Sequence, residues 1–170
     1  MSLLSGCAAT SSESGGPTHA QLDEMSDAAI STLLATNPDA RQIIDESVGY
    51  AVLNMTVTKV PVIGTGVGYG VVSDKLSDTR SYIRVSRFEM GSGMGANKYK
   101  VIIVFTDHSL VQKIATTAWH YDLGAEASAG DKSADGRSNT EGKGYKVFRI
   151  MDSGALASVT VRVARAQPYL

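Results

Sequence analysis

Three consecutive residues, Asp107, His108 and Ser109, carry the acid, base and nucleophile types of a hydrolase relay. A relay needs these side chains to converge through two hydrogen bonds. Neighbouring residues on a helix or strand point in different directions, so consecutive residues do not converge. Asp107 is better explained as a helix N-cap, because a short carboxylate accepts hydrogen bonds from the first N–H groups of a helix. No active site is expected, and we predict that the chain is not an enzyme.

Glycines at alternate positions 64, 66, 68 and 70 resemble the glycine pattern of a phosphate-binding loop. Such a loop follows a strand and opens a helix. Here the next residues, 71–74, continue as strand and turn, and the Gly-Lys-Ser/Thr ending of a Walker loop is missing. Four glycines on one strand face instead require a close neighbour. With Gly91, Gly93 and Gly95, they predict the close-packing seam of a curved sheet.

Metal and cofactor chemistry has little support in the sequence. The three histidines, His19, His108 and His120, are scattered without the helical spacing of a paired metal site. A single cysteine, Cys7, excludes an intrachain disulfide and a cysteine-based metal cluster. We expect no cofactor.

Basic side chains are the remaining candidates for binding. Two of them share one strand face, another lies on a second strand, and three gather near a long loop. The candidate lipid-binding residues are Arg84, Lys98, Lys100, Lys143, Lys146 and Arg149. Each Lys or Arg near an anionic membrane contributes about 1 kcal/mol. The alternative is an ordinary solvated surface. Nucleic acid is not expected as a partner, because no basic helix or exposed aromatic platform is evident.

Two helices precede the residues of the predicted sheet. Leu22, Met25, Ala29 and Leu33 recur at helical spacing, and Thr18 or a neighbour can cap this segment. Asn37-Pro38 then predicts a cap and first residue for a second helix of about 38–46. A third helix of about 108–118 follows Asp107.

From residue 48 the apolar period changes from helical spacing to two, which is typical of strands. The predicted strands are 48–55, 63–72, 82–89, 99–106, 121–129, 144–151 and 156–165. Between two of them, residues 130–144 have no apolar pattern and form either a mobile or a functional loop. The expected fold is α+β: N-terminal helices packed on a curved, mostly antiparallel sheet or barrel-like core of about seven strands, with one further helix near 108–118.

The net charge of −1 hides an asymmetry. Residues 1–47 contain one Arg and seven acids (1 − 7 = −6), and residues 48–170 contain 15 basic residues and 10 acids (15 − 10 = +5). A basic body attracts phosphates of membranes or nucleic acids. The alternative is that the two parts simply neutralise each other. No run approaches the about 18 apolar residues of a membrane span.

The segment Leu3-Leu4-Ser5-Gly6-Cys7-Ala8 resembles the lipobox of bacterial lipoproteins. The resemblance implies that Cys7 is acylated and anchors the chain, with residues 1–20 as lipobox remnant and flexible tether. A chance Ser-Gly-Cys sequence is the alternative. The residues after the cysteine, Ala8-Ala9, lack the aspartate of inner-membrane retention, which favours the outer membrane, facing the periplasm or the cell surface.

From about Ala40 to Val163 the chain resembles the SYLF domain family, of the yeast actin-patch or Las17-binding type. Residues 21–170 would form one such domain, and five segments carry the resemblance. They are 47–53 (Ser-Val-Gly-Tyr-Ala-Val-Leu), the glycine strand 64–72, 91–95 (Gly-Ser-Gly-Met-Gly) with the apolar strand 101–105, and 123–130 (Leu-Gly-Ala-Glu-Ala-Ser-Ala-Gly). The family's usual Trp-containing segment is replaced by Tyr82-Ile83-Arg84-Val85. This suits a bacterial lipoprotein branch.

The resemblance implies lipid binding, with anionic phospholipid headgroups in place of the phosphoinositides of eukaryotic members. The expected protein is therefore a non-catalytic lipid-binding domain of a bacterial envelope lipoprotein. The alternative is a structural or protein-interaction module of the envelope, which engages another protein through a sheet edge or the 130–144 loop.

Overall fold

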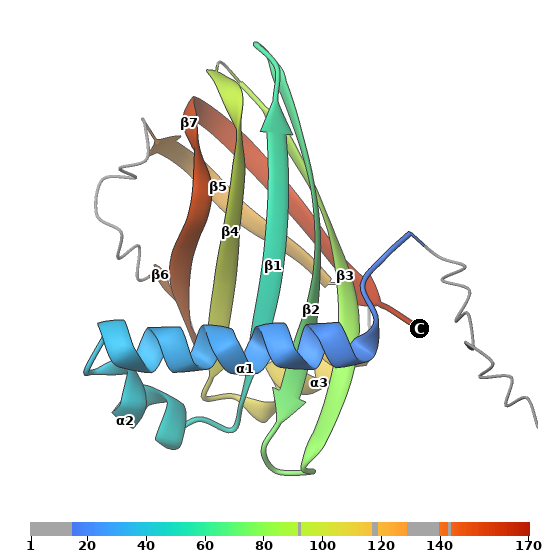
Figure 1. Cartoon of the computed structure of the whole chain (residues 1–170), viewed down its shortest axis with the longest axis vertical. Coiled ribbons are helices and arrows are strands. Elements are labelled where there is room, and N and C mark those ends of the chain that lie inside the picture. Colours follow the sequence, from blue (N-terminus) through green and yellow to red (C-terminus); the bar gives the residue numbers. More distant parts are fainter. Residues whose placement is uncertain (1–14, 92, 117–118, 129–139, 143) are drawn as a thin grey trace, which may run out of the picture.

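The computed structural model describes residues 15–91, 93–116, 119–128, 140–142 and 144–170. Within them the chain forms three helices and seven strands, so the α+β prediction is confirmed (Figure 1). The helices are α1 (His19–Thr36), α2 (Ala40–Asp45) and α3 (His108–Thr116). The strands are β1 (Gly49–Lys59), β2 (Ile63–Asp74), β3 (Thr79–Met90), β4 (Gly93–Phe105), β5 (Trp119–Ser128), β6 (Thr140–Gly142) and β7 (Tyr145–Pro168).

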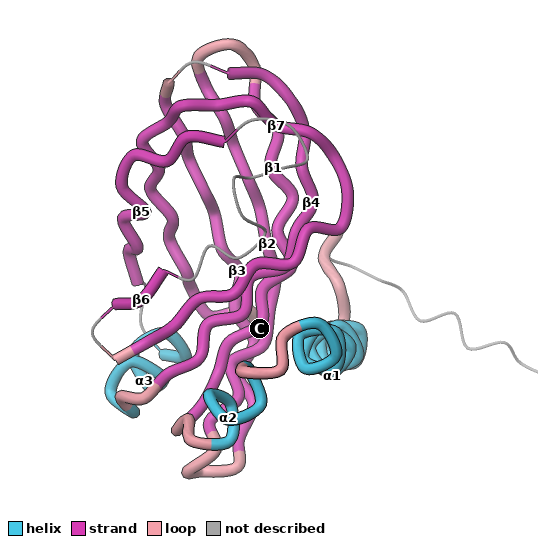
Figure 2. Tube along the Cα trace, turned by 90° about the vertical axis from the view of Figure 1, so that its left-hand side faces the viewer, coloured by secondary structure: helices cyan, strands magenta, loops and turns pink. Residues whose placement is uncertain are grey.

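All strand pairs are antiparallel and belong to one sheet. Six strands follow one another in the order β3-β2-β1-β4-β7-β5, and the short β6 pairs with β7. The second half of β7 also pairs with β3, which curves the sheet strongly (Figure 2). Among the described residues, β3 and β5 at the two ends of this order do not pair with each other. The sheet is therefore strongly curved, and β5 continues it beyond β7 as an open edge.

Three predicted boundaries were wrong. The sequence predicted two strands separated by a turn at Asp152-Ser153-Gly154, but β7 runs through this segment. A register shift opposite Lys98 and Tyr99 accommodates the extra residue as a β-bulge, which explains why the turn-forming residues do not end the strand. The strand β6 also falls inside the predicted 130–144 loop. Asn37 ends α1 instead of opening α2, which begins only at Ala40.

The helices α1 and α2 lie on one side of the sheet, here called the outer face, and α3 closes one end of the opposite inner face (Figures 1 and 2). Helix α1 begins with a capping box, in which Thr18 and Gln21 exchange side-chain-to-backbone hydrogen bonds. Its first turns are held to β3 by stacking of His19 on Tyr82 and by ion pairs from Arg80 to acids of α1. The N-terminal helix is thus fixed across the sheet.

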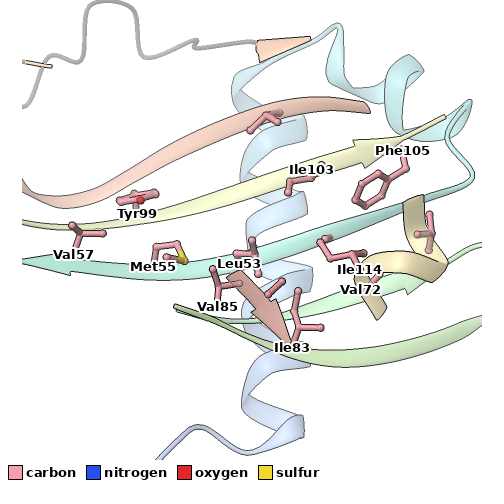
Figure 3. Packing of buried hydrophobic residues seen from close by; sticks show 14 residues of the cluster. Leu53, Met55, Val57, Val72, Ile83, Val85, Tyr99, Ile103, Phe105 and Ile114 are labelled. Atoms are coloured by element: carbon pink, nitrogen blue, oxygen red, sulfur yellow. The ribbon is translucent and has the colours of Figure 1, made fainter. Parts of the chain in front are cut away.

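Two apolar clusters share the sheet. Alternate residues of β1 separate them, because Leu53, Met55 and Val57 point to the inner face while Val52 points to the outer face. The inner cluster is the larger, and it is closed by Val111 and Ile114 of α3 (Figure 3). The outer cluster packs α1 and α2 on the sheet and covers only the part of the outer face nearest those helices.

Candidate functional site

The predicted basic residues of β3 and β4 lie on the outer face but do not form one patch. Arg84 and Lys100 belong to the same cross-strand row, in which β2 and β1 separate them by about three strand spacings, or about 14 Å. Arg84 is exposed and lies over the ring of Tyr69, with 5.8 Å from Cζ to the ring centroid. Lys98 is also exposed, whereas Lys100 is neutralised by Asp152 at 2.6 Å.

The other predicted basic residues separate further. Lys146 lies over Phe148, which belongs to the outer cluster, with 5.9 Å from Nζ to the ring centroid. Arg149 faces the opposite side, where its Cζ lies 5.2 Å from the centroid of Tyr99 in the inner cluster. Lys143 and Cys7 lie outside the described residues. The structure therefore keeps Arg84 and Lys98 as the exposed cations of the predicted set.

An exposed apolar tip, which the sequence did not predict, lies at the end of the sheet opposite α3. The β1–β2 turn and the start of β4 meet here, because the N–H groups of Gly91 and Gly93 donate to the carbonyl oxygens of Val62 and Pro61. Six side chains form the tip and are between 45% and 66% exposed: Val60, Val62, Ile63, Phe88, Met90 and Met94. Such a concentration is typical of surfaces that contact a membrane or a protein partner.

Among the described residues around the tip, the exposed charges have one sign. Residues 54–67 and 86–98 contain a single acid, Glu89, and its side chain is fully buried. Lys98 of β4, two residues after Ala96, is exposed on the outer face. The acids of α1 and α2 lie with those helices, towards the other end of the sheet (Figure 1). Among the residues whose side chains are described, the tip therefore combines exposed apolar side chains with a neighbourhood in which the single acid is buried.

The glycines of β2 lie on the inner face of the sheet, and the structure explains why this face of the strand carries no side chains. Each glycine of β2 stands between a residue of β1 and a residue of β3 in the same row. A Cβ on Gly66 would lie 2.8 Å from Val57 Cγ2 and 3.3 Å from Arg87 Cβ. A Cβ on Gly64 would lie 3.3 Å from both Lys59 Cγ and Glu89 Cβ. The bare strand lets side chains of β1 and β3 meet across it, as expected of a close-packing seam.

The second glycine group has a different cause. Gly91, Gly93 and Gly95 have φ values of 138°, 146° and 147°, a region that side chains disfavour. These glycines therefore serve the backbone geometry of the β3–β4 connection, next to the tip.

Beneath the tip, the inner face carries a buried charged cluster. Lys59 of β1 and Glu89 of β3 are both opposite Gly64, and their Nζ and Oε2 atoms are 3.7 Å apart across it. Arg87 Nη2 lies 2.5 Å from Glu89 Oε1, and Arg87 Nη1 donates a hydrogen bond to the Tyr99 hydroxyl. Lys59 and Glu89 are fully buried and Arg87 nearly so.

The Asp-His-Ser sequence makes no relay. Asp107 accepts hydrogen bonds from the N–H and the hydroxyl of Ser109, which lower the pKa of its carboxyl, and it caps α3 as predicted. His108 Nε2 lies 2.8 Å from Asp74 Oδ2 instead. Burial raises the pKa of Asp74, but hydrogen bonds from His108 and from the Ser77 and Leu76 backbone outweigh it, so the pKa is lowered. These contacts tie α3 to the end of β2.

Two further findings concern absences among the described residues. No group of three His, Cys, Asp or Glu side chains there is placed to hold a metal ion. No helix in the same part of the chain is long and apolar enough to cross a membrane.

Comparison with known proteins gives one distant similarity. The chain is 24% identical over 140 residues to the Beta cell expansion factor A of Aeromonas veronii, a match that covers 82% of this chain. The chain spans about half the length of this curated relative, 53% of it. No family model matches the chain.

Proposed function

We propose that the chain is a non-catalytic lipid-binding domain whose tip contacts membranes containing anionic phospholipids. The exposed apolar tip carries this proposal, because a bilayer offers apolar side chains at the end of two turns a fluid environment in which to be buried. The turns project from the end of the sheet, so they can enter a headgroup layer without moving α1 or the inner cluster.

The apolar contribution outweighs the electrostatic one. Complete burial of an exposed side chain of this size yields about 1.5–3 kcal/mol, so each half-exposed tip residue would contribute about 1 kcal/mol, or about 6 kcal/mol for six before entropic costs. Arg84 and Lys98 near an anionic surface would add about 2 kcal/mol together. We therefore expect salt to weaken binding without abolishing it.

In this proposal the charge asymmetry of the chain orients the domain towards the membrane. The acids of α1 and α2 lie away from the tip, and Arg80 forms ion pairs with two of them, Asp23 and Asp27. A membrane approached by the tip therefore meets the apolar and basic end first.

The resemblance to the SYLF domain family and the lipobox-like segment support the same setting. Within this proposal, acylated Cys7 anchors the chain in the bacterial envelope, and the outer membrane is favoured by Ala8-Ala9. Acyl anchoring would keep the tip close to lipid, so even modest affinity would suffice.

Vesicle co-sedimentation of the full chain carrying Cys7→Ser tests the proposal without the anchor. Vesicles of phosphatidylcholine are compared with vesicles that also contain phosphatidylglycerol, at low and high salt. Binding that is stronger to the anionic vesicles and reduced but still present at high salt is the expected result. Absence of binding to both vesicle types would refute the proposal.

A matched pair of variants locates the contact. Met94 at the tip and Leu76 in the β2–β3 turn are 66% and 65% exposed, but they lie at opposite ends of the sheet. Met94→Gln should weaken vesicle binding about fivefold, because about 1 kcal/mol of apolar burial is lost. Leu76→Gln should leave binding unchanged. Equal effects would mean that the tip is not the contact. Capture of one stoichiometric envelope protein by the tip, without lipid binding, would favour the protein-interaction alternative.

A further inference from the structure

The tip contains the exposed methionines of the described part of the chain. The chain has six methionines, and five of them lie among the described residues. Met90 and Met94 of the tip are 57% and 66% exposed, whereas Met55 is 3% exposed within the inner cluster (Figure 3). Met25 and Met151 are partly buried against the outer and the inner cluster. An oxidant dissolved in water therefore meets the methionines of the tip before those of the two clusters.

Oxidation of a thioether removes the property that makes the tip a contact surface. Methionine sulfoxide is a polar side chain, whereas methionine is a flexible apolar one. The other four side chains of the tip are hydrocarbons, which a peroxide leaves unchanged. Met90 and Met94 are therefore the part of the tip whose polarity can change in the folded protein.

The position of these two methionines separates the tip from the packing of the fold. They flank the β3–β4 connection, where the N–H groups of Gly91 and Gly93 bind the backbone of the β1–β2 turn. These backbone hydrogen bonds do not involve the thioether groups. A sulfoxide oxygen in a core would be buried without a hydrogen-bond partner, but on an exposed side chain it remains in water. The tip can therefore become polar while both apolar clusters stay packed.

We propose that Met90 and Met94 form a reversible oxidation site that changes the tip from apolar to polar and thereby weakens its contact with membranes. The inference rests on the proposed membrane contact and adds its regulation. The thioether sulfur attacks one oxygen of hydrogen peroxide, so that an S–O bond forms as the O–O bond breaks. The sulfur loses two electrons, and the second oxygen leaves as water with both protons. A methionine sulfoxide reductase reverses the step with a dithiol, which becomes a disulfide while the sulfoxide oxygen leaves as water.

Peptide mapping by mass spectrometry of the full chain carrying Cys7→Ser tests the site without lipid. The substitution removes the single thiol, and the tryptic peptide 88–98 contains both tip methionines. Low concentrations of hydrogen peroxide should oxidise this peptide well before Met55 of the inner cluster. The oxidised chain should keep its Tm within about 2 °C of the untreated chain, because both clusters stay packed. Oxidation of Met55 as fast as peptide 88–98 would overturn the proposal.

Vesicle co-sedimentation of the same chain before and after peroxide measures the effect on membrane binding. Oxidation of both thioethers should weaken binding to vesicles that contain phosphatidylglycerol about tenfold or more, because two apolar side chains become polar. Reduction by the reductases for both sulfoxide epimers should restore binding. The matched variant with Met90→Leu and Met94→Leu should show the same affinity before and after peroxide, because leucine has no thioether. If this variant loses affinity after peroxide as the Met90 and Met94 chain does, the tip methionines are not the site.

Retention on a phenyl column distinguishes failure of the oxidation site from failure of the membrane contact. Retention measures the exposed apolar surface directly, so the oxidised chain should elute earlier than the untreated chain. The double-leucine variant should elute at one position before and after peroxide. This shift without any vesicle binding by the untreated chain would refute the membrane contact and leave the oxidation site standing. Unchanged retention after oxidation of peptide 88–98, or vesicle binding that oxidation leaves unchanged, would overturn the proposal.

Discussion

Substitution of single glycines in β2 by alanine should produce a graded loss of stability along one strand. A Cβ on Gly64 meets only side-chain atoms, at 3.3–3.4 Å, and these can move by a few tenths of an ångström. A Cβ on Gly70 would overlap the backbone carbonyl oxygen of Val52 and would lie 2.7 Å from Leu53 Cδ2. A backbone oxygen cannot move away through a change of rotamer, so Gly70→Ala must shift β1 against β2.

The expected magnitudes follow from these contacts. Replacing a strand glycine reduces the entropy of the unfolded chain, which favours the alanine by about 0.4–1 kcal/mol. Overpacking typically costs about 1–3 kcal/mol. Gly64→Ala should therefore change the free energy of unfolding by less than about 1 kcal/mol. Gly70→Ala should destabilise by about 3 kcal/mol, or roughly 6–12 °C in Tm for a chain of this size.

Thermal unfolding of the purified chain followed by circular dichroism measures the series. Gly15→Ala is the control, because a Cβ there would have no atom within 4 Å. If Gly70→Ala melts within about 2 °C of Gly15→Ala, the overlap with Val52 does not constrain the sheet and the close-packing explanation fails. If Gly64→Ala is as damaging as Gly70→Ala, the distinction between side-chain and backbone contacts is wrong.

Two further predictions concern the helices. The lowered pKa of Asp74 means that its pairing with His108 stabilises the fold above the ordinary carboxyl pKa of 3.8 and is lost as pH falls through the still lower folded value. Asp74→Asn should therefore be less stable than the wild type at pH 7 in denaturant titrations, and the difference should shrink below about pH 4, whereas Asp78→Asn should differ little at either pH. Arg80→Met should increase amide exchange in α1 and destabilise the fold by about 1 kcal/mol or less, a small effect because both ion pairs of Arg80 are partly exposed. The control Lys98→Met should change neither amide exchange in α1 nor stability.

The spacing of apolar residues predicted the helices and strands well where one face of the element is buried and the other is open along its length. The apolar spacing of α1 and the alternation in β1 and β3 correspond to one buried and one open side. Prediction failed at the bulge opposite Lys98 and Tyr99, because turn-forming residues also fit a bulge and the sequence does not distinguish them. The predicted strand 99–106 begins later than β4, which starts at Gly93, because three of the first five residues of β4 are Gly or Ala, which are poor strand formers.

The candidate site was harder to predict than the fold. An apolar residue at a strand position is usually buried, so the residue types of Phe88 and Met90 give no sign that these side chains are exposed. The burial of Lys59 and Glu89 is hard to predict for the opposite reason, since charged side chains are rarely fully buried. The alternation of side chains along β3 could have indicated the buried acid and the exposed Phe. Counted from the buried Ile83 and Val85, Glu89 falls on the inner face and Phe88 on the outer face.

The pairing of β7 with β3 has a consequence for how the chain reaches its fold. Their paired residues are between 71 and 85 positions apart, from 161 − 90 and 168 − 83. Strands β1, β2 and β3 pair through short connections, and β4 pairs with β1 at separations of 36 to 56 positions, from 95 − 59 and 105 − 49. The free edge of β3 stays uncovered until the last part of β7 arrives. An uncovered edge invites pairing with another chain. Slow closure of this long-range pair should therefore limit the folding rate, and shortening β7 at its C-terminal end should promote intermolecular strand pairing before it removes the inner core.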